Sequence, residues 1–203
     1  MTFYIYTDGH ANPNPGPTGT GVAVYDSQGK LVKALSGRYE SNGTNNTAEL
    51  YGILEGLLVD LPDSQGSQGS QGSEPDRIIL SDSQYAINSS SVWAEKWKSK
   101  GWKFGINSKR KIKNLDLIKE IHGVYSNSTK TQLQKVKGHS GDTGNDLADL
   151  LAGIATGSAM KELPLERFTK YSALKSLPRH VPAVPVAKSK SKSIKDFFSN
   201  SKT

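Results

Sequence analysis

The chain has 203 residues, a formal net charge of +7 and no cysteine. This length can bury a sizeable core, so we expect one domain with an additional segment. The lack of cysteine excludes disulfides and cysteine-ligated zinc or iron–sulfur sites. No apolar run approaches a membrane span and no charged, apolar leader precedes the first strand, so we expect an intracellular, cytoplasmic protein with no membrane association.

The positive charge is unevenly distributed. Residues 1–157 contain 16 Lys and Arg against 16 Asp and Glu, whereas residues 158–203 contain 10 against 3. Within the neutral part, residues 96–113 hold eight Lys and Arg and no acid. A local basic block beside scattered acids suggests a polyanion bound next to a metal site.

The first strand is predicted to end in a carboxylate. Aromatic and β-branched residues alternate over residues 3–7 and lead to Asp8, after which the chain is dense in Gly, Pro and Asn. Gly9 would let backbone and ligand approach closely, so Asp8 is suited to hold a cation or position a water. An Asx-turn that closes a hairpin is the alternative for Asp8 alone. Three further acids, each after an apolar strand or on a helix face, favour the cation site.

Two strands, 19–25 and 31–35, should form an antiparallel meander with the first. Residues 48–58 carry apolar side chains at three- and four-residue spacing, which predicts a helix capped by Thr47 or Asn46. Glu49 would then lie in the first helical turn. There a favourable interaction with the helix dipole is a structural alternative to metal binding.

A repeat of Gln-Gly-Ser over residues 64–73 predicts a flexible loop without a function of its own. The short apolar strand 77–81 then runs into Asp82, which repeats the opening arrangement. Because a helical crossover separates it from the meander, this strand should pair in parallel with the first and bring Asp82 near Asp8.

The remaining pattern alternates helices with one more strand. Its elements are predicted helices over 83–88, 91–98 and 114–122, a strand over 131–136, a His-bearing loop over 137–145 and a helix over 146–152. Asp146 and Asp149 are three residues apart and share a face of the last helix.

Together these motifs resemble type 1 ribonuclease H over residues 1–157. The matching segments are Thr7-Asp8-Gly9, Ala48-Glu49-Leu50, Ser81-Asp82-Ser83, Lys137-Gly138-His139-Ser140-Gly141 and Ala148-Asp149. The resemblance implies an α/β, ribonuclease H-like fold, with a five-stranded mixed sheet in the order 3-2-1-4-5 flanked by helices. It also implies a catalytic domain over 1–157, and leaves 158–203 as a basic, largely flexible tail.

The resemblance places four metal-binding carboxylates at Asp8, Glu49, Asp82 and Asp149. Two Mg²⁺ ions are implied, with Mn²⁺ as a possible substitute. Hard cations of this kind take oxygen ligands. His139 would be a mobile proton carrier that assists product departure, although a lone loop histidine is more often simply solvated.

Asp142 and Asp146 lie near the fourth carboxylate position of the family. The family's acid follows the loop histidine by ten positions and directly precedes the Leu-x-Ala of the final helix. Only Asp149 meets both conditions.

The implied substrate is an RNA–DNA hybrid, in which the 2′-hydroxyl distinguishes the RNA strand. Asn14, Asn45, Asn46 and Gln84 match minor-groove contacts of the family. Thr44 and Asn114 match a pocket that holds a DNA-strand phosphate in the family. Some members have an Arg in this pocket, where this chain has Asn42. Each Asn has an alternative role as a turn residue or cap.

Residues 92–113 resemble the basic protrusion with which some members grip the duplex. Trp93, Lys98, Trp102 and Lys103 are its candidate contacts. For the two tryptophans, packing of the protrusion onto the domain is the other interpretation, and Trp97 is expected to pack.

The end of the tail resembles the short peptide by which replication proteins bind a sliding clamp. Ile194, Phe197 and Phe198 would form its apolar plug, and Ser191 stands where such peptides usually have Gln. A basic tether to duplex that ends in incidental apolar residues is the alternative.

We therefore expect a monomeric, Mg²⁺-dependent endoribonuclease that hydrolyses the RNA strand of RNA–DNA hybrids, leaving 5′-phosphate and 3′-hydroxyl ends. A role in primer or hybrid removal during DNA replication would follow. The alternatives are a non-catalytic hybrid-binding module and an adaptor recruited to a clamp. The presence of all four acids argues against the first.

Overall fold

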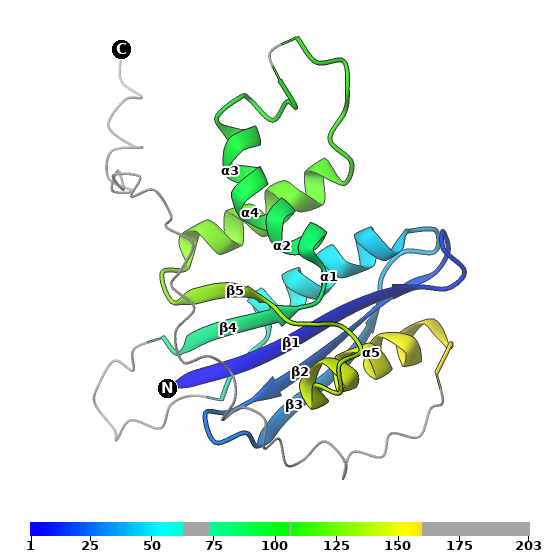
Figure 1. Cartoon of the computed structure of the whole chain (residues 1–203), viewed down its shortest axis with the longest axis vertical. Helices are drawn as coiled ribbons and strands as arrows, with labels where there is room; N and C mark the ends of the chain where they lie inside the picture. The colour runs from blue at the N-terminus through cyan, green and yellow to red at the C-terminus, as the bar shows by residue number, and fades with distance from the viewer. Residues whose placement is uncertain (63–73, 106, 160–203) are drawn as a thin grey trace.

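The computed structural model describes residues 1–62, 74–105 and 107–159 (Figure 1). Its elements are β1 (Thr2–Ala11), β2 (Thr18–Tyr25), β3 (Leu31–Arg38), α1 (Asn45–Leu58), β4 (Asp76–Ser81), α2 (Gln84–Ser90), α3 (Val92–Lys98), α4 (Leu115–Asn127), β5 (Thr131–Lys135) and α5 (Thr143–Thr156). The predicted loop 64–73 and the clamp-peptide residues Ile194, Phe197 and Phe198 lie outside the described residues.

The strands form one five-stranded sheet in the order β3-β2-β1-β4-β5. β1 pairs antiparallel with β2 and parallel with β4, and β4 pairs parallel with β5. The predicted ribonuclease H-like topology is confirmed.

Each face of the sheet has its own core because side chains alternate along β1. Phe3 and Ile5 pack with α1 and α4 on one face, and Tyr6 packs with Leu147 and Leu151 of α5 on the other. The molecule is therefore layered, with α1 and α2 against one face of the sheet, α3 and α4 packed on these helices, and α5 against the opposite face (Figure 1). Among the helices that the structure describes, none has the length and apolar character needed to cross a membrane.

Helix α1 approaches β1 unusually closely at Asp8. A Cβ on Gly9 would overlap the backbone of Ala48 and Glu49, and a Cβ on Gly52 would lie 3.0 Å from the carbonyl oxygen of Asp8. Glycine at both positions is what permits this approach. The contact fixes the start of α1, and with it Glu49, beside Asp8.

Strand β1 is longer than predicted, because it continues through Asp8 and Gly9 to Ala11. Its antiparallel pairing with β2 extends to Ala11 opposite Thr18, and this ladder outweighs the low strand propensity of glycine. The parallel ladder with β4, in contrast, ends at the pair Thr7 and Ser81.

Helix α1 begins earlier than predicted, because Thr44 is its N-cap instead of Asn46 or Thr47. The Thr44 backbone is extended, and its hydroxyl accepts a hydrogen bond from the Thr47 amide at 3.3 Å. Glu49 therefore lies beyond the first turn, which contains no acid. The structural alternative for Glu49, an interaction with the helix dipole, loses its basis.

Candidate active site

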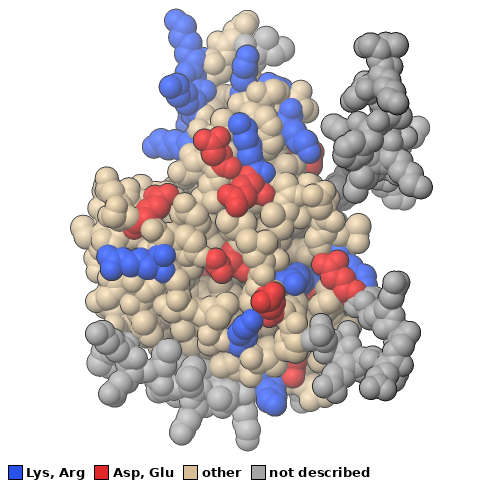
Figure 2. Space-filling view, turned by 180° about the vertical axis from the view of Figure 1, so that it is seen from behind, with Lys and Arg blue, Asp and Glu red and all other residues tan. Residues whose placement is uncertain are grey.

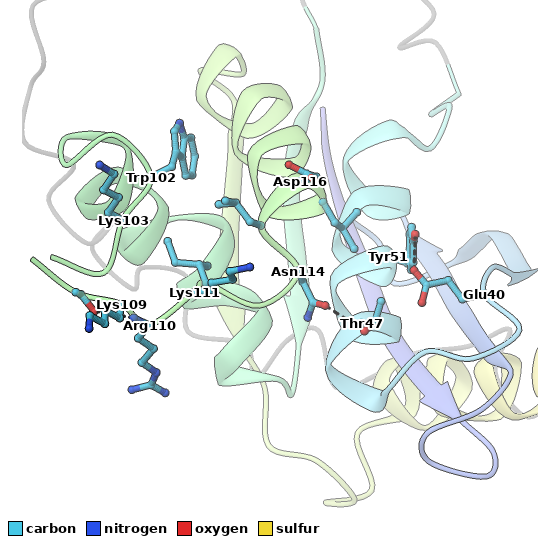
Figure 3. A pocket seen from close by; sticks show the side chains of 14 residues that line it. Glu40, Thr47, Tyr51, Trp102, Lys103, Lys109, Arg110, Lys111, Asn114 and Asp116 are labelled. Carbon is cyan, nitrogen blue, oxygen red and sulfur yellow. Dashed lines mark hydrogen bonds between the residues drawn. The ribbon is translucent and has the colours of Figure 1, made fainter. Parts of the chain in front are cut away.

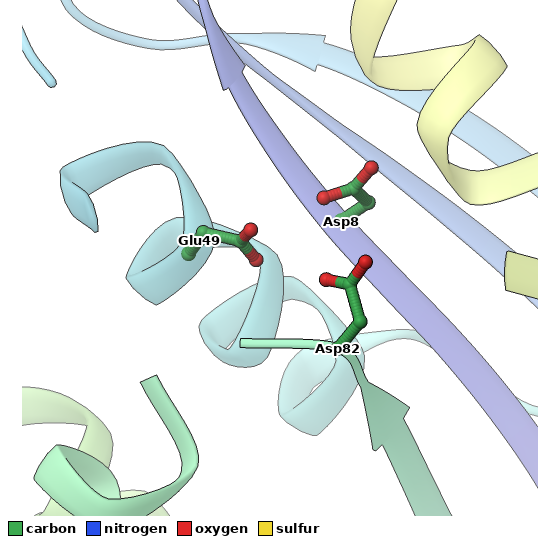
Figure 4. A group of neighbouring side chains, drawn as sticks. All are labelled: Asp8, Glu49 and Asp82. Atoms are coloured by element: carbon green, nitrogen blue, oxygen red, sulfur yellow. The ribbon is translucent and has the colours of Figure 1, made fainter. Parts of the chain in front are cut away.

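Three of the predicted metal ligands come together from three different elements. Asp8 lies on β1, Glu49 on α1, and Asp82 directly after β4 (Figure 4). One carboxylate oxygen of each lies within 4.8 Å of the others. Asp8 and Asp82 are the residues that follow the last parallel pair of β1 and β4, which is why two neighbouring strands deliver them to the same place.

Burial and mutual repulsion make this cluster costly to ionise. Burial, and then the Asp82 carboxylate, raise the pKa of Asp8 to about 7, against the effect of a 2.7 Å hydrogen bond from the Gly9 amide. Burial, followed by Asp8 and Asp82, raises the pKa of Glu49 well above its usual value. A divalent cation would relieve this repulsion.

An unsatisfied oxygen shows that the cluster fits such a cation. Glu49 Oε2 is buried and has no hydrogen-bond partner among the described residues. A buried acceptor without a partner is costly, and bound metal is one way to satisfy it. Three converging carboxylates form the oxygen donor set that Mg²⁺ or Mn²⁺ prefers.

The raised pKa of Asp8 predicts that the metal-free protein loses stability as the pH rises. Between about pH 4 and pH 7 the unfolded chain releases a proton that the folded chain retains at Asp8, so unfolding becomes more favourable with increasing pH. In EDTA, we expect the melting temperature to fall from pH 5 to pH 8, and added Mg²⁺ to restore it more at pH 8.

Other titrating groups also change the melting temperature with pH. The contribution of Asp8 is isolated by comparing the pH dependence of the melting temperature in wild type and in Asp8→Asn. Scanning calorimetry in EDTA should show a smaller fall for the variant. Equal falls in the two proteins would refute the effect of Asp8.

Asp149 reaches the cluster from the opposite layer. It lies on α5, where its side chain is within hydrogen-bonding reach of Asp8, although it is outside the three-acid group. Asp142, in contrast, is the N-cap of α5 and accepts hydrogen bonds from the amides of Gly144 at 3.0 Å and Asn145 at 3.1 Å. This cap also explains why α5 begins at Thr143, before the predicted start.

His139 lies on the exposed loop between β5 and α5, with a positive φ of 49°. Its neighbour Gly138 packs against the Asp82 carboxylate so closely that a Cβ there would collide with Oδ2. The loop that carries His139 is thus in contact with the acid cluster through Gly138.

Several of the predicted substrate residues meet at the start of α1. Asn45 Oδ1 accepts a hydrogen bond from the Ala11 amide at 2.9 Å, and Asn14 Oδ1 accepts one from the Asn45 amide at 3.3 Å. Asn46 is exposed beside them. Gln84, at the start of α2, is exposed and donates to Asn88 Oδ1 at 3.0 Å.

The structure links Thr44 and Asn114, the two residues predicted to form a phosphate pocket. The hydroxyl of Thr47 lies 3.0 Å from that of Thr44 and donates to Asn114 Oδ1 at 3.4 Å. Asn114 Nδ2 in turn donates to the Tyr85 hydroxyl at 3.3 Å. Asn114 has a left-handed backbone, with a φ of 55°.

The family model for RNase H matches residues 1–156. The chain belongs to the ribonuclease H family. As a member it is a nuclease, and the acid cluster described above lies within the matched residues.

Curated relatives support this assignment over nearly their whole length. The chain is 37% identical over 151 residues to a ribonuclease H of Ruthia magnifica, covering 74% of this chain and 92% of the relative. It is 38% identical over 152 residues to a ribonuclease HI of Neisseria meningitidis, covering 75% of this chain and 93% of the relative. The family member described here is thus of type 1, as its motifs predict.

Solved structures support the fold of this family member. LC9-RNase H1, described as a type 1 RNase H with the type 2 active-site motif, superposes with a TM-score of 0.63 at 22% identity, covering 95% of this chain and 97% of that one. RNase H1 of Halobacterium salinarum gives a TM-score of 0.50 at 21% identity, covering 78% and 100%.

Basic side chains of this ribonuclease H-family chain gather on one part of the molecule. Figure 2 shows Lys and Arg side chains gathered on the part of the molecule that projects beyond the sheet. Lys98 and Lys103 are exposed there. A cavity of about 710 Å³ lies between this projection and α1, with Lys103, Lys109, Arg110 and Lys111 among its lining residues (Figure 3).

The tryptophans of the projection make packing contacts. The Trp102 ring meets His122 edge-on at a centroid distance of 6.0 Å, and Trp97 meets Phe104 at 5.7 Å. Trp93 contacts Tyr85 and Trp97 but keeps 36% of its surface exposed. Trp97 and Trp102 thus make packing contacts, and Trp102, like Trp93, is not fully buried.

His122, which sequence reasoning did not single out, ties the projection to the domain. Its ring is buried on α4, with Nδ1 3.3 Å from the Ser90 carbonyl oxygen and Nε2 3.1 Å from Glu95 Oε1. These two partners belong to α2 and α3. A sequence signal existed, since His122 follows Ile118 by four residues and so shares the apolar face of α4.

Replacing His122 by Leu should loosen the projection. We expect the free energy of unfolding to fall by about 1–3 kcal/mol, because the buried Ser90 carbonyl oxygen loses its partner His122 Nδ1. Trypsin should cleave the basic residues 96–113 faster in the variant. Glu95→Gln, which keeps the shape of a largely exposed side chain, should have a smaller effect. Identical digestion of wild type and His122→Leu would show that His122 does not hold the projection to the domain.

Proposed function

We propose that the chain hydrolyses the RNA strand of RNA–DNA hybrids in a Mg²⁺-dependent reaction that leaves 5′-phosphate and 3′-hydroxyl ends. The observation that carries the proposal is the convergence of Asp8, Glu49 and Asp82 around a buried, unsatisfied Glu49 oxygen, in a chain of the ribonuclease H family. The names of its relatives support the choice of reaction.

Four carboxylates would hold two Mg²⁺ ions, with Mn²⁺ as a substitute. When bound, such ions would activate a water and stabilise the leaving 3′ oxygen. Asp8 would contribute to both metal positions, and its interactions with Asp82 and Asp149 support this role. Asp149 would serve the water-activating position, and Glu49 and Asp82 the other.

His139 would move a proton during product departure. Its exposed position on the loop after β5 gives the imidazole access to solvent, and the contact of Gly138 with Asp82 keeps this loop next to the reacting groups.

Substrate recognition would use the polar start of α1 and the basic projection. Asn14, Asn45, Asn46 and Gln84 offer short amide groups, suited to 2′-hydroxyls and base edges in a minor groove. The linked pair Thr44 and Asn114 would hold a phosphate of the DNA strand. Trp93, Lys98, Trp102 and Lys103 belong to the surface that would accept the rest of the duplex backbone.

We further propose that the protein acts as a monomer in removing primers or other hybrids during replication. Recruitment to a sliding clamp would involve Ile194, Phe197 and Phe198. Deleting residues 188–203 should leave hydrolysis of a free hybrid unchanged. Loss of hydrolysis with this deletion would contradict a purely recruiting tail.

The reaction is tested by incubating the purified full chain with an end-labelled hybrid in Mg²⁺, with duplex DNA, single-stranded RNA and duplex RNA as controls. We expect only the hybrid to be cut, EDTA to stop cutting, and the products to carry 5′-phosphates. Binding of the hybrid without cutting in either Mg²⁺ or Mn²⁺ would instead identify a non-catalytic binding module.

A further inference from the structure

Lys135 places an ammonium group beside the acid cluster. It is the last residue of β5 and pairs with Ser81 of β4, the residue before Asp82. Its Nζ donates a hydrogen bond to the backbone carbonyl oxygen of Asp82. The strand register therefore directs the Lys135 side chain toward one particular side of the cluster, the side formed by Glu49 and Asp82.

The charge of Lys135 acts on Glu49 in the opposite direction to the acids. Asp8 and Asp82 disfavour the ionised Glu49 carboxylate, whereas Lys135 favours it. In the metal-free protein this ammonium therefore offsets part of the repulsion among the carboxylates. A divalent cation bound by Glu49 and Asp82 would be repelled by the same positive charge.

We propose that Lys135 is a positioning residue whose ammonium, held by the Asp82 carbonyl, weakens divalent-cation binding at the Glu49–Asp82 side until a substrate phosphate is present. This inference rests on the proposed function, because it assumes that the carboxylates hold metal ions. The phosphate would add negative charge next to the ammonium and the ion, and so offset their repulsion. Lys135 would thereby link occupancy of this position to substrate binding.

The direct test is calorimetric titration of Mn²⁺ into the full chain without substrate. We expect Lys135→Met to bind Mn²⁺ about three- to tenfold more tightly than wild type, the range for removing one partly screened charge. Lys135→Arg, which retains the charge, should restore the wild-type affinity.

Lys130→Met is the matched control. Lys130 directly precedes β5, and its Nζ also donates to a backbone carbonyl, that of Glu74 at 2.8 Å. The substitution removes the same charge and the same kind of hydrogen bond at the far end of the strand, so Mn²⁺ affinity should not change. A gain equal to that of Lys135→Met would show a general charge effect and overturn the inference.

Kinetics separate this role from substrate contact. With Lys135→Met, the Mg²⁺ concentration for half-maximal cleavage at saturating hybrid should fall by a smaller factor than the Mn²⁺ dissociation constant, because the substrate phosphate already offsets the Lys135 charge in wild type. An unchanged metal affinity with a raised KM would instead make Lys135 a substrate contact. That result would overturn this inference but leave the proposed function intact. If wild type and Asp8→Asn bound Mn²⁺ with equal affinity, Asp8 would not be a metal ligand. That result would contradict both the proposed metal site and the proposed function.

Discussion

Replacing Asp8 by Asn is expected to abolish strand cleavage and, at the same time, to stabilise the metal-free protein. The carboxylate is central to the cluster, since Asp82, Asp149 and Glu49 all interact with it. If Asp8 holds metal ions as proposed, its loss should reduce cleavage by at least about 10³-fold. Relief of buried like charges should raise the free energy of unfolding at pH 8 by about 1–4 kcal/mol.

Both effects can be measured on the same preparation, with initial cleavage rates in Mg²⁺ and thermal unfolding in EDTA. Asp116→Asn is a suitable control, because Asp116 is an exposed residue of α4 whose carboxylate lies 3.7 Å from Lys119 Nζ. It should alter neither quantity appreciably. A variant at Asp8 that lost activity and also lost stability would point to damaged packing instead of a lost metal ligand.

Replacing Gly9 by Ala should be among the most damaging single substitutions in the domain. The added Cβ would overlap backbone atoms of Ala48 and Glu49, which cannot move aside as a flexible side chain can. We expect a loss of at least about 3 kcal/mol in the free energy of unfolding, or failure to accumulate folded protein.

Gly123→Ala provides the matched control for Gly9→Ala. Gly123 lies inside α4, and a Cβ there would have no neighbour within 4 Å. The same chemical change should stabilise the protein by up to about 1 kcal/mol through helix propensity. Urea unfolding of the two variants measures the contrast, and similar midpoints for both would show that β1 and α1 can separate without penalty.

The parts of the fold that follow from chain pattern were predictable. The apolar strands before Asp8 and Asp82, with a helical crossover between them, predicted the parallel pairing that places these acids side by side. The order of the five strands followed from the family resemblance and is confirmed. Glu49 lies on the predicted helix, but not in its first turn as expected, because Thr44 is the N-cap of α1.

What escaped prediction depends on register and on contacts between distant segments. Lys135 reads as an ordinary exposed strand residue until its pairing with Ser81 is known. Gly138 reads as a loop glycine until its contact with the Asp82 carboxylate is seen. The end of β1 was misplaced because local propensity favoured a turn after Asp8, whereas β2 supplies hydrogen-bonding partners up to Ala11.

The unequal pairing of β1 on its two sides has a consequence for how the protein accommodates ions of different radius. Asp8 lies within the antiparallel ladder, with paired residues before and after it, whereas Asp82 lies in a bend beyond the last residue of β4. The backbone at Asp8 is thus held by pairing with β2 both before and after this residue. The backbone at Asp82 has no such pairing in the described strands. If the site binds Mg²⁺ as proposed, the adjustment in ligand position when Mn²⁺ replaces it should therefore fall on Asp82, while Asp8 stays in place.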